Sequence, residues 1–321
     1  MITKILPYNW IDSVQSFIRV IDELEAIYGP ELRDPSVSRW SLFRGHSDEL
    51  YQPEPAIYRD FEGESVFYTN EQLMIQEVIR LMPTEFERLS AFQILAKLQH
   101  YGLPTRLLDV TTNPLVALFF ACGGSEEVDG EVVVFPNQSV YREDSAQVEW
   151  LSRWAINGTW GPTSEGSLMQ AVGYDSTKNR SALIEHSEPI EALTQRFTAV
   201  RPMHTNERLK AQSGAFLIAG LEIDRRAEQN LFVRPHRGCI GEDTGRDTTL
   251  QIHEPRIIVT GESKSRILRQ LDRLNINFST LFPEPQNIIR YVHDGFKNHI
   301  FGETNVSRRI DTSAFREYDS N

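Results

Sequence analysis

The stretch LAKLQHYGLPTRLLDVTTNPLVALFFACG, residues 95–123, decides the fold. It predicts a helix that ends at Gly102, because glycine adopts the left-handed conformation of a helix C-cap without penalty. A short strand follows over Thr105–Val110. Asn113 and the proline after it are typical of a helix start, and Pro114–Cys122 is apolar nearly all round, which indicates a buried helix. Because His, Tyr, Arg, Asp and Thr gather at these junctions, we expect a functional site here.

Composition and charge limit the class of protein. The chain has 321 residues, 40% of them hydrophobic and 24% charged, with a net charge of −12. This is ordinary for a folded protein, and the acidic balance disfavours broad affinity for nucleic acid or anionic membranes. No apolar run approaches the length of a membrane span, so we expect no membrane partner. Cys122 and Cys239 lie far apart in no metal-ligand spacing, which favours a reduced, cytoplasmic setting.

The rest of the chain predicts one mixed domain. Residues 1–38 are expected to form an N-terminal helical segment, 39–300 the domain itself, and 301–321 a mobile tail. Periodicity predicts a helix over 85–101 that brings His100 to its C-terminal end. Strand patterns include 40–45, 131–135, 215–219 and 255–260, whereas about 138–200 reads as a mostly helical insertion. The fold class predicted is therefore α+β.

Several side chains of the central stretch have both a structural and a functional interpretation. His100 is either a capping histidine or a base with a pKa near neutrality. Asp109, in a strand that looks buried, must be either paired or functional. Arg106 can bind phosphate or pair with Asp109, although the two would point to opposite faces of a strand. A tyrosine at a helix end, such as Tyr101, is more often part of the core.

Several motifs together resemble one known family, the FRG domain. Phe43-Arg44-Gly45 resembles the motif that gives this family its name. Residues 99–102 and 104–109 look like its central signature. Further matching positions are Thr111, Pro114, Ala117, residues 119–121, Arg208, Gln212, Gly214, Phe216 and residues 281–283. The resemblance spans about residues 40–292, with 138–200 fitting least, so the 39–300 domain is identified as a member of this family.

The resemblance implies a fold and a set of site residues. FRG domains occur in bacteria and phages, often beside toxin–antitoxin or anti-phage genes, and their architecture is similar to the split β core with surrounding helices of ADP-ribosyltransferases. In that fold an Arg or His on the first core strand binds NAD, and the resemblance assigns this position to Arg44. A Ser/Thr-rich strand end then leads into a helix, and the resemblance assigns this second position to Asp109 and Thr111. A glutamate normally precedes a later strand, but here Gln212 and Ser213 stand there.

The expected function is that of an NAD-dependent ADP-ribosyltransferase toxin in anti-phage defence, with RNA as the acceptor and an antitoxin protein as a partner. NAD would be the donor substrate. Its binding residues would be Arg44, Tyr101, Arg106 and Thr111, and the catalytic residues His100, Asp109 and Gln212. RNA binding would need a basic face around Arg44, Arg59 and Arg106. No pattern predicts a metal site. A zinc site that combines His100 with His186 or His204 is not supported by the spacing of these residues.

Two other functions stay open. The same cluster of Arg, His and Tyr could form a non-catalytic module that binds a nucleotide or RNA. An RNA-cleaving toxin could instead use His100 as its general base. The sequence has no Walker loop, G-x-S-x-G or H-E-x-x-H motif. All these functions require Arg44 and His100 to meet at one cleft.

Overall fold

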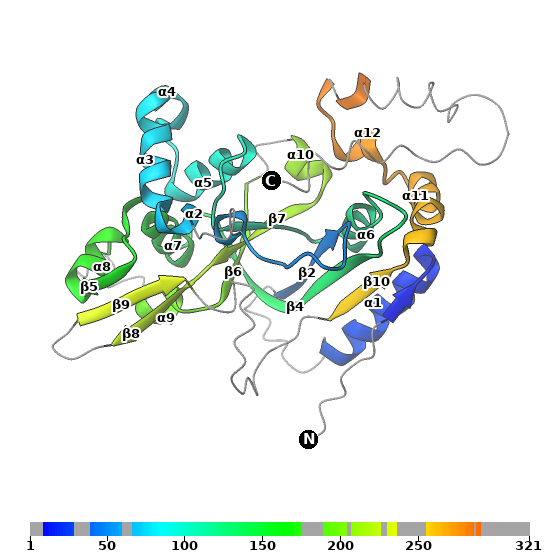
Figure 1. Cartoon of the computed structure of the whole chain (residues 1–321), viewed down its shortest axis with the longest axis horizontal. Coiled ribbons are helices and arrows are strands. Elements are labelled where there is room, and N and C mark those ends of the chain that lie inside the picture. The colour runs from blue at the N-terminus through cyan, green and yellow to red at the C-terminus, as the bar shows by residue number, and fades with distance from the viewer. Residues whose placement is uncertain are drawn as a thin grey trace.

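The computed structural model describes residues 9–28, 39–59, 66–174, 189–203, 207–225, 230–235, 255–285 and 287–289. The architecture is α+β, as the sequence predicts. A twisted sheet runs through the middle of the molecule (Figure 1). Helices α1, α6 and α11 lie on the right of this view, and α3, α5, α7 and α8 lie on the left.

The main sheet has seven strands in the order β1-β10-β4-β2-β3-β7-β6. The 13-residue strand β4 pairs with β2 and β10 through its first part, and its last residues pair in parallel with β6. This additional pairing closes β4, β2, β3, β7 and β6 into a barrel-like sheet. The strands are β1 (Asn9–Ile11), β2 (Arg39–His46), β3 (Leu107–Thr111), β4 (Gly130–Arg142), β6 (Phe197–Arg201), β7 (Gly214–Ala219) and β10 (Arg256–Val259). A second sheet contains β5 (Gly161–Ser164), β9 (Asn230–Pro235) and β8 (Leu221–Arg225).

Helices cover the outside of the barrel. They are α1 (Val14–Tyr28), α2 (Val66–Thr69), α3 (Glu71–Leu81), α4 (Pro83–Phe86), α5 (Ala91–His100), α6 (Pro114–Ala121), α7 (Ala146–Asn157), α8 (Glu165–Ala171), α9 (Pro189–Leu193), α10 (Glu207–Ala211), α11 (Lys264–Arg273) and α12 (Phe278–Leu281). Short 3-10 turns occur at η1 (Ala56–Tyr58) and η4 (Gly261–Ser263). Among the described residues, none of these helices combines the length and the apolar character that a membrane crossing requires.

Alternating residues divide the core into layers. The barrel interior holds buried side chains such as Leu42, Leu108 and Val133. The opposite sheet face packs against α1, α6 and α11, and a separate cluster joins α5 and α7 to β7. Arg44 and His46 follow Leu42 at a spacing of two, so they point to the barrel side of β2, at the end of the strand. This placement puts polar side chains at the mouth of the barrel.

Helix α6 lies unusually close to the sheet because two strands carry glycines beneath it. A Cβ built at Gly45 would lie 1.9 Å from the carbonyl oxygen of Ala117, and one at Gly130 would lie 2.0 Å from that of Ala121. Both obstacles are helix backbone, which cannot rotate away as a side chain can. Gly45 in the Phe-Arg-Gly motif therefore has a packing role.

Replacing Gly45 with alanine should lower the free energy of unfolding by about 2–3 kcal/mol, because α6 must move away from β2. Urea denaturation measures this change. The matched control is Gly166→Ala on α8, where the new methyl would meet only the Ser164 side chain at 3.9 Å. Equal stability of the two variants would contradict the packing role.

Most expected elements are confirmed, with one clear exception. The strand and helix of the central stretch appear as β3 and α6, and β3 and β4 belong to one sheet. The continuous helix predicted over 85–101 is wrong. Arg88 has a positive φ of 65°, which interrupts the helical conformation between α4 and α5. Helix α5 then starts afresh with a capping box, in which Ser90 and Gln93 exchange side-chain and backbone hydrogen bonds.

Several packing contacts bear on the predicted domain boundaries. Strand β1 pairs with β10, and α1 contributes Phe17 and Ile21 to the main core, so residues 9–28 of the predicted N-terminal segment pack against the domain. Strand β4 continues to Arg142, into the region read as an insertion, and α7, β5, α8 and α9 follow it. The predicted tail lies outside the described residues. Cys122 is buried as expected, and burial raises the pKa of its thiol.

Candidate functional site

A cleft of about 680 Å³ lies between α5 and α6, against β2, β3 and β7. This volume falls within the range of pockets that hold small ligands. Five residues that the sequence singled out line it: Arg44, His100, Asp109, Thr111 and Gln212. They come from four separate segments of the chain, with Asp109 and Thr111 sharing β3, so only the folded molecule brings them together. The convergence of Arg44 and His100 on one cleft, which the candidate functions require, is present.

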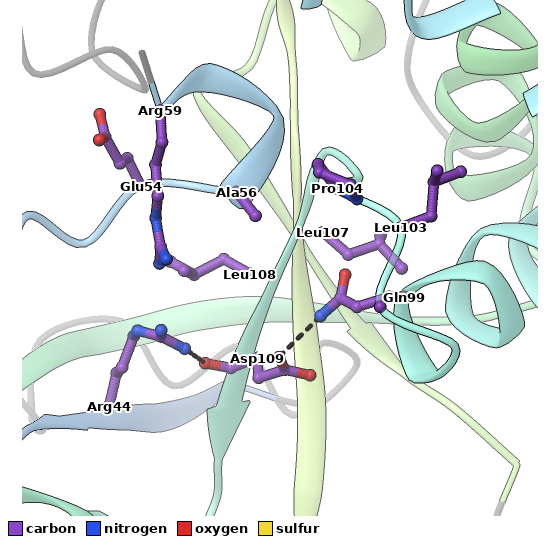
Figure 2. Close-up of a pocket in the computed structure, with 11 residues that line it drawn as sticks. Arg44, Glu54, Ala56, Arg59, Gln99, Leu103, Pro104, Leu107, Leu108 and Asp109 are labelled. Atoms are coloured by element: carbon purple, nitrogen blue, oxygen red, sulfur yellow. Dashed lines mark hydrogen bonds between the residues drawn. The ribbon is translucent and has the colours of Figure 1, made fainter. Parts of the chain in front are cut away.

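Arg44 is half-buried where the barrel opens into the cleft. Its Nη1 donates to the backbone oxygen of Asp109 at 2.8 Å, as Figure 2 shows, and its Nε donates to His46 Nε2 at 2.9 Å. Two contacts on different edges of the guanidinium fix its plane. A fixed guanidinium suits bidentate binding of a phosphate or carboxylate.

A second, smaller cavity of about 40 Å³ adjoins the cleft. Arg44, Gln99 and Asp109 line both spaces, and Arg59 and Glu54 line the small one (Figure 2). Arg44 and Arg59 flank this cavity from β2 and from the end of η1. The cleft therefore continues into a recess with two guanidinium groups.

Asp109 does not have the buried environment that the sequence suggested. Its side chain is exposed, and its carboxylate Oδ2 accepts a hydrogen bond from Gln99 Nε2 at 2.7 Å. Thr105 in turn donates to Gln99 Oε1 at 2.5 Å, which fixes the amide orientation. Strand β3 is buried at Leu108 and Val110, but Asp109 points to the other side. It thus presents a carboxylate to the cleft.

The other candidate polar groups lie around Asp109. His100 ends α5 and is exposed to solvent. Thr111 donates its hydroxyl hydrogen to the backbone oxygen of Gln212 at 2.7 Å, which ties β3 to the loop before β7. Gln212 donates through Nε2 to the oxygen of Leu281 at 3.1 Å. Its Oε1 is therefore the atom suited to meet a ligand hydroxyl.

The far part of the cleft is aromatic. Phe92 and Phe216 form an edge-to-face pair with centroids 5.7 Å apart, and Phe120 and Phe282 form another at 6.0 Å. The Arg208 guanidinium carbon lies 4.8 Å from the centroid of the Phe282 ring. All five residues line the cleft. Phe120 is the partly exposed ring, and Phe92, Phe216 and Phe282 are buried around the cleft. An apolar ring beside the Arg208 guanidinium is suited to a heteroaromatic ring joined to an anionic group.

Two residues predicted to bind NAD lie elsewhere. Arg106 is fully buried and pairs with Glu71: its Nε donates to Oε1 at 2.9 Å, and its Nη2 contacts Oε2. Tyr101 is 53% exposed, and its hydroxyl donates to Glu85 at 3.2 Å. Neither residue lines the cleft. The prediction for both is corrected, because Arg106 neutralises a buried carboxylate and Tyr101 turns toward α4.

Sequence reasoning missed a buried polar chain behind Arg44. His46 Nδ1 lies 2.8 Å from Glu131 Oε1, and Arg256 Nη1 donates to Glu131 Oε2 at 3.0 Å. His46 and Glu131 are directly opposite each other on β2 and β4 and are almost fully buried. Two signals were present: His46 follows Arg44 at strand spacing, and Glu131 opens a run of valines.

Burial shifts the pKa of both groups. It lowers the pKa of His46 well below 6.5, helped by Arg44, Arg256 and Arg59. Burial also raises the pKa of Glu131 to about 7, against the opposing effect of Arg256. The cause is the same in both cases, since a buried site disfavours whichever form is charged.

Stability should therefore depend on pH through His46. Below pH 6.5 the unfolded chain binds a proton that the buried imidazole refuses, so the free energy of unfolding falls as the pH drops toward the lower folded pKa. The Glu131 contribution has the opposite sign between its folded pKa of about 7 and the 4.5 of an ordinary glutamate. Comparison with His46→Gln isolates the imidazole. Relative to that variant, wild type should lose up to about 1.4 kcal/mol per pH unit. A constant difference across mildly acidic pH would contradict a buried neutral imidazole.

Comparison with known proteins gives one match. Residues 39–130 match the sequence model of the FRG domain. No curated protein and no solved structure is significantly similar to the chain. The matched segment contains Arg44, His100 and Asp109, and it runs from the first residue of β2 to the first of β4. Residues 39–130 therefore form an FRG domain, and this segment supplies both α5 and α6, the two helices that border the cleft.

Proposed function

We propose that the cleft binds NAD and that the protein transfers ADP-ribose from NAD to an acceptor, as a toxin of anti-phage defence. The observation that carries this proposal is the meeting of Arg44, His100 and Asp109 with an aromatic surface in one cleft of about 680 Å³. The fixed guanidinium suits a pyrophosphate, and the phenylalanines suit a base or nicotinamide ring. The likeness of the barrel-like sheet to ADP-ribosyltransferases belongs to the same proposal.

The residues divide the chemistry among them. Cleavage of the bond between nicotinamide and ribose develops positive charge at the anomeric carbon, as in glycoside hydrolysis. The exposed carboxylate of Asp109 would stabilise this charge, with Gln99 holding its orientation. Gln212 would accept a hydrogen bond from a ribose hydroxyl. His100 would remove the proton from the incoming acceptor, a task that histidine side chains commonly perform in enzymes.

RNA is the proposed acceptor, but fewer basic residues are available to bind it than the sequence suggested. The predicted basic face included Arg106, but that side chain is buried against Glu71. Arg44 and Arg59 remain at the small cavity, and Arg208 and Lys97 line the cleft. These cations give the cleft and its recess a local electrostatic attraction for RNA, on a chain with a net charge of −12.

Labelled NAD tests the proposal directly. The full-length protein is incubated with NAD labelled at the adenylate phosphate, together with RNA, DNA or protein, and the fate of the label is followed. We expect label on RNA from the wild type and from Arg80→Ala, a surface control on α3 whose side chain is 66% exposed. NAD that stays intact and unbound would refute the proposal.

A non-catalytic nucleotide- or RNA-binding module is the second candidate. It is favoured by one observation: Gln212 and Ser213, and no glutamate, precede β7. Saturable NAD binding without turnover would establish this function. RNA fragments that appear without NAD would instead indicate an RNA-cleaving toxin that uses His100 as its base.

A further inference from the structure

We propose that His46 and Glu131 form a buried relay that positions Arg44 for an anionic ligand in the cleft. The relay runs from Arg256 through Glu131 and His46 to Arg44 along hydrogen bonds of 3.0, 2.8 and 2.9 Å. Arg44 then reaches the backbone of Asp109 at 2.8 Å. His46 and Glu131 do not line the cleft, so they act through Arg44 and are positioning residues.

The donors and acceptors determine the state of His46. An arginine Nε always carries a hydrogen and can only donate. His46 Nε2 must therefore accept from Arg44, which leaves the proton of the neutral ring on Nδ1. That proton is donated to Glu131 Oε1. The imidazole is thus held as the neutral Nδ1–H tautomer by a cation on one side and a carboxylate on the other.

Protonation of His46 would break the relay on the Arg44 side. With hydrogens on both ring nitrogens, His46 Nε2–H would face Arg44 Nε–H. Two donors cannot form a hydrogen bond, so the Arg44 side chain would have to move away. Burial and the nearby positive charges oppose this protonation, whereas the Glu131 carboxylate favours it. Arg44, Arg256 and Arg59 act on it as positive charges, Glu131 accepts from it, and the Tyr51 ring meets it edge-on at 6.3 Å. Asp48 and Glu49 add negative charge near Glu131.

The relay predicts different effects for two substitutions of one residue. An asparagine amide reaches only the position of the imidazole Nδ1, so His46→Asn keeps a contact with Glu131 and loses the one with Arg44. A glutamine amide reaches the position of Nε2, so His46→Gln keeps an acceptor for Arg44. Loss of a hydrogen bond to a charged group corresponds to a weakening of about tenfold or more. His46→Asn should therefore weaken anion binding, and His46→Gln should restore it.

The choice of ligand for this test rests on the proposed function, whereas the relay itself does not depend on that function. Calorimetry with inorganic pyrophosphate and with NAD measures binding to the full-length protein and both variants. We expect His46→Asn to lower affinity for pyrophosphate about tenfold and His46→Gln to bind within about threefold of wild type. Pyrophosphate itself gains protons in acid, so affinity should fall for both proteins, but it should fall more steeply for wild type than for His46→Gln. Equal weakening by the two variants would overturn the proposal.

Nitrogen-15 NMR of the wild type tests the relay without any ligand. The His46 signals should report the Nδ1–H tautomer. The Arg44 Nε–H signal, assigned by its loss in Arg44→Lys, should exchange slowly with water. An Nε2–H tautomer or a rapidly exchanging Nε–H would refute the relay even if NAD binds. If these signals are as expected but neither NAD nor pyrophosphate binds, the relay stands as a structural feature, and its role in ligand binding and the proposed function both fail.

Discussion

Replacing Arg44 with alanine is expected to reduce ADP-ribose transfer from NAD by at least about 100-fold, while the protein stays folded. The size follows from removing a fixed charged donor, which typically costs two to three orders of magnitude in rate. Arg44 is half-buried, and its hydrogen bonds to His46 and to the backbone oxygen of Asp109 are made to uncharged acceptors, so losing these two bonds strands no charge. Radiolabel transfer and toxicity in cells are the two measurements.

Arg44→Lys separates charge from geometry. Lysine keeps the positive charge but lacks the planar fork that meets His46 and Asp109 at once. We expect this variant to remain well below wild type. His100→Ala provides a second comparison, since it should lose transfer but keep NAD binding. Wild-type activity in both Arg44→Ala and His100→Ala would remove the proposed site.

Arg106→Met is expected to lower the free energy of unfolding by about 3–5 kcal/mol, because it leaves the buried carboxylate of Glu71 without a counter-charge. Arg106 is fully buried and Glu71 is 3% exposed. The Trp160 ring covers the guanidinium at 5.4 Å. Urea denaturation monitored by tryptophan fluorescence measures the loss.

Two controls make this stability prediction specific. Arg80→Met breaks a surface pair with Glu77, in which both side chains are more than half exposed, and should change stability by less than about 0.5 kcal/mol. The double variant Arg106→Met with Glu71→Leu removes both buried charges and should recover most of the loss. A double variant as unstable as the single one would show that the pair is not the cause.

The central stretch could be predicted because its signals are local. The Asn113–Pro114 pair marks a helix start, and Gly102, with a φ of 91°, marks a helix end in the structure as in the sequence. Local signals also determine where Thr111 and Asp109 stand relative to α6. Local signals do not determine how exposed each side chain is to solvent. Asp109 is exposed although it lies in a mostly apolar strand.

The residues that sequence reasoning misplaced or overlooked have side-chain partners that lie far away in the sequence. Arg106 looks like a phosphate ligand until Glu71, 35 residues earlier, is brought onto it by α3. His46 gains its meaning from Glu131, 85 residues later, through the register of β2 and β4. Such pairings depend on the packing of α3 against the start of β3 and on the register of β2 with β4, which no window of sequence contains.

The pairing of β1 with β10 has a consequence for protein synthesis. Residues 9–11 find their neighbours only at 257–259, so the sheet edge waits for almost 250 further residues to be made. At about 5–20 residues per second this takes roughly 10–50 s. The cleft also needs Gln212 and Phe282, which leave the ribosome late. A nascent chain therefore has no assembled cleft, and the ability to bind a ligand arises only after residue 282 has left the ribosome.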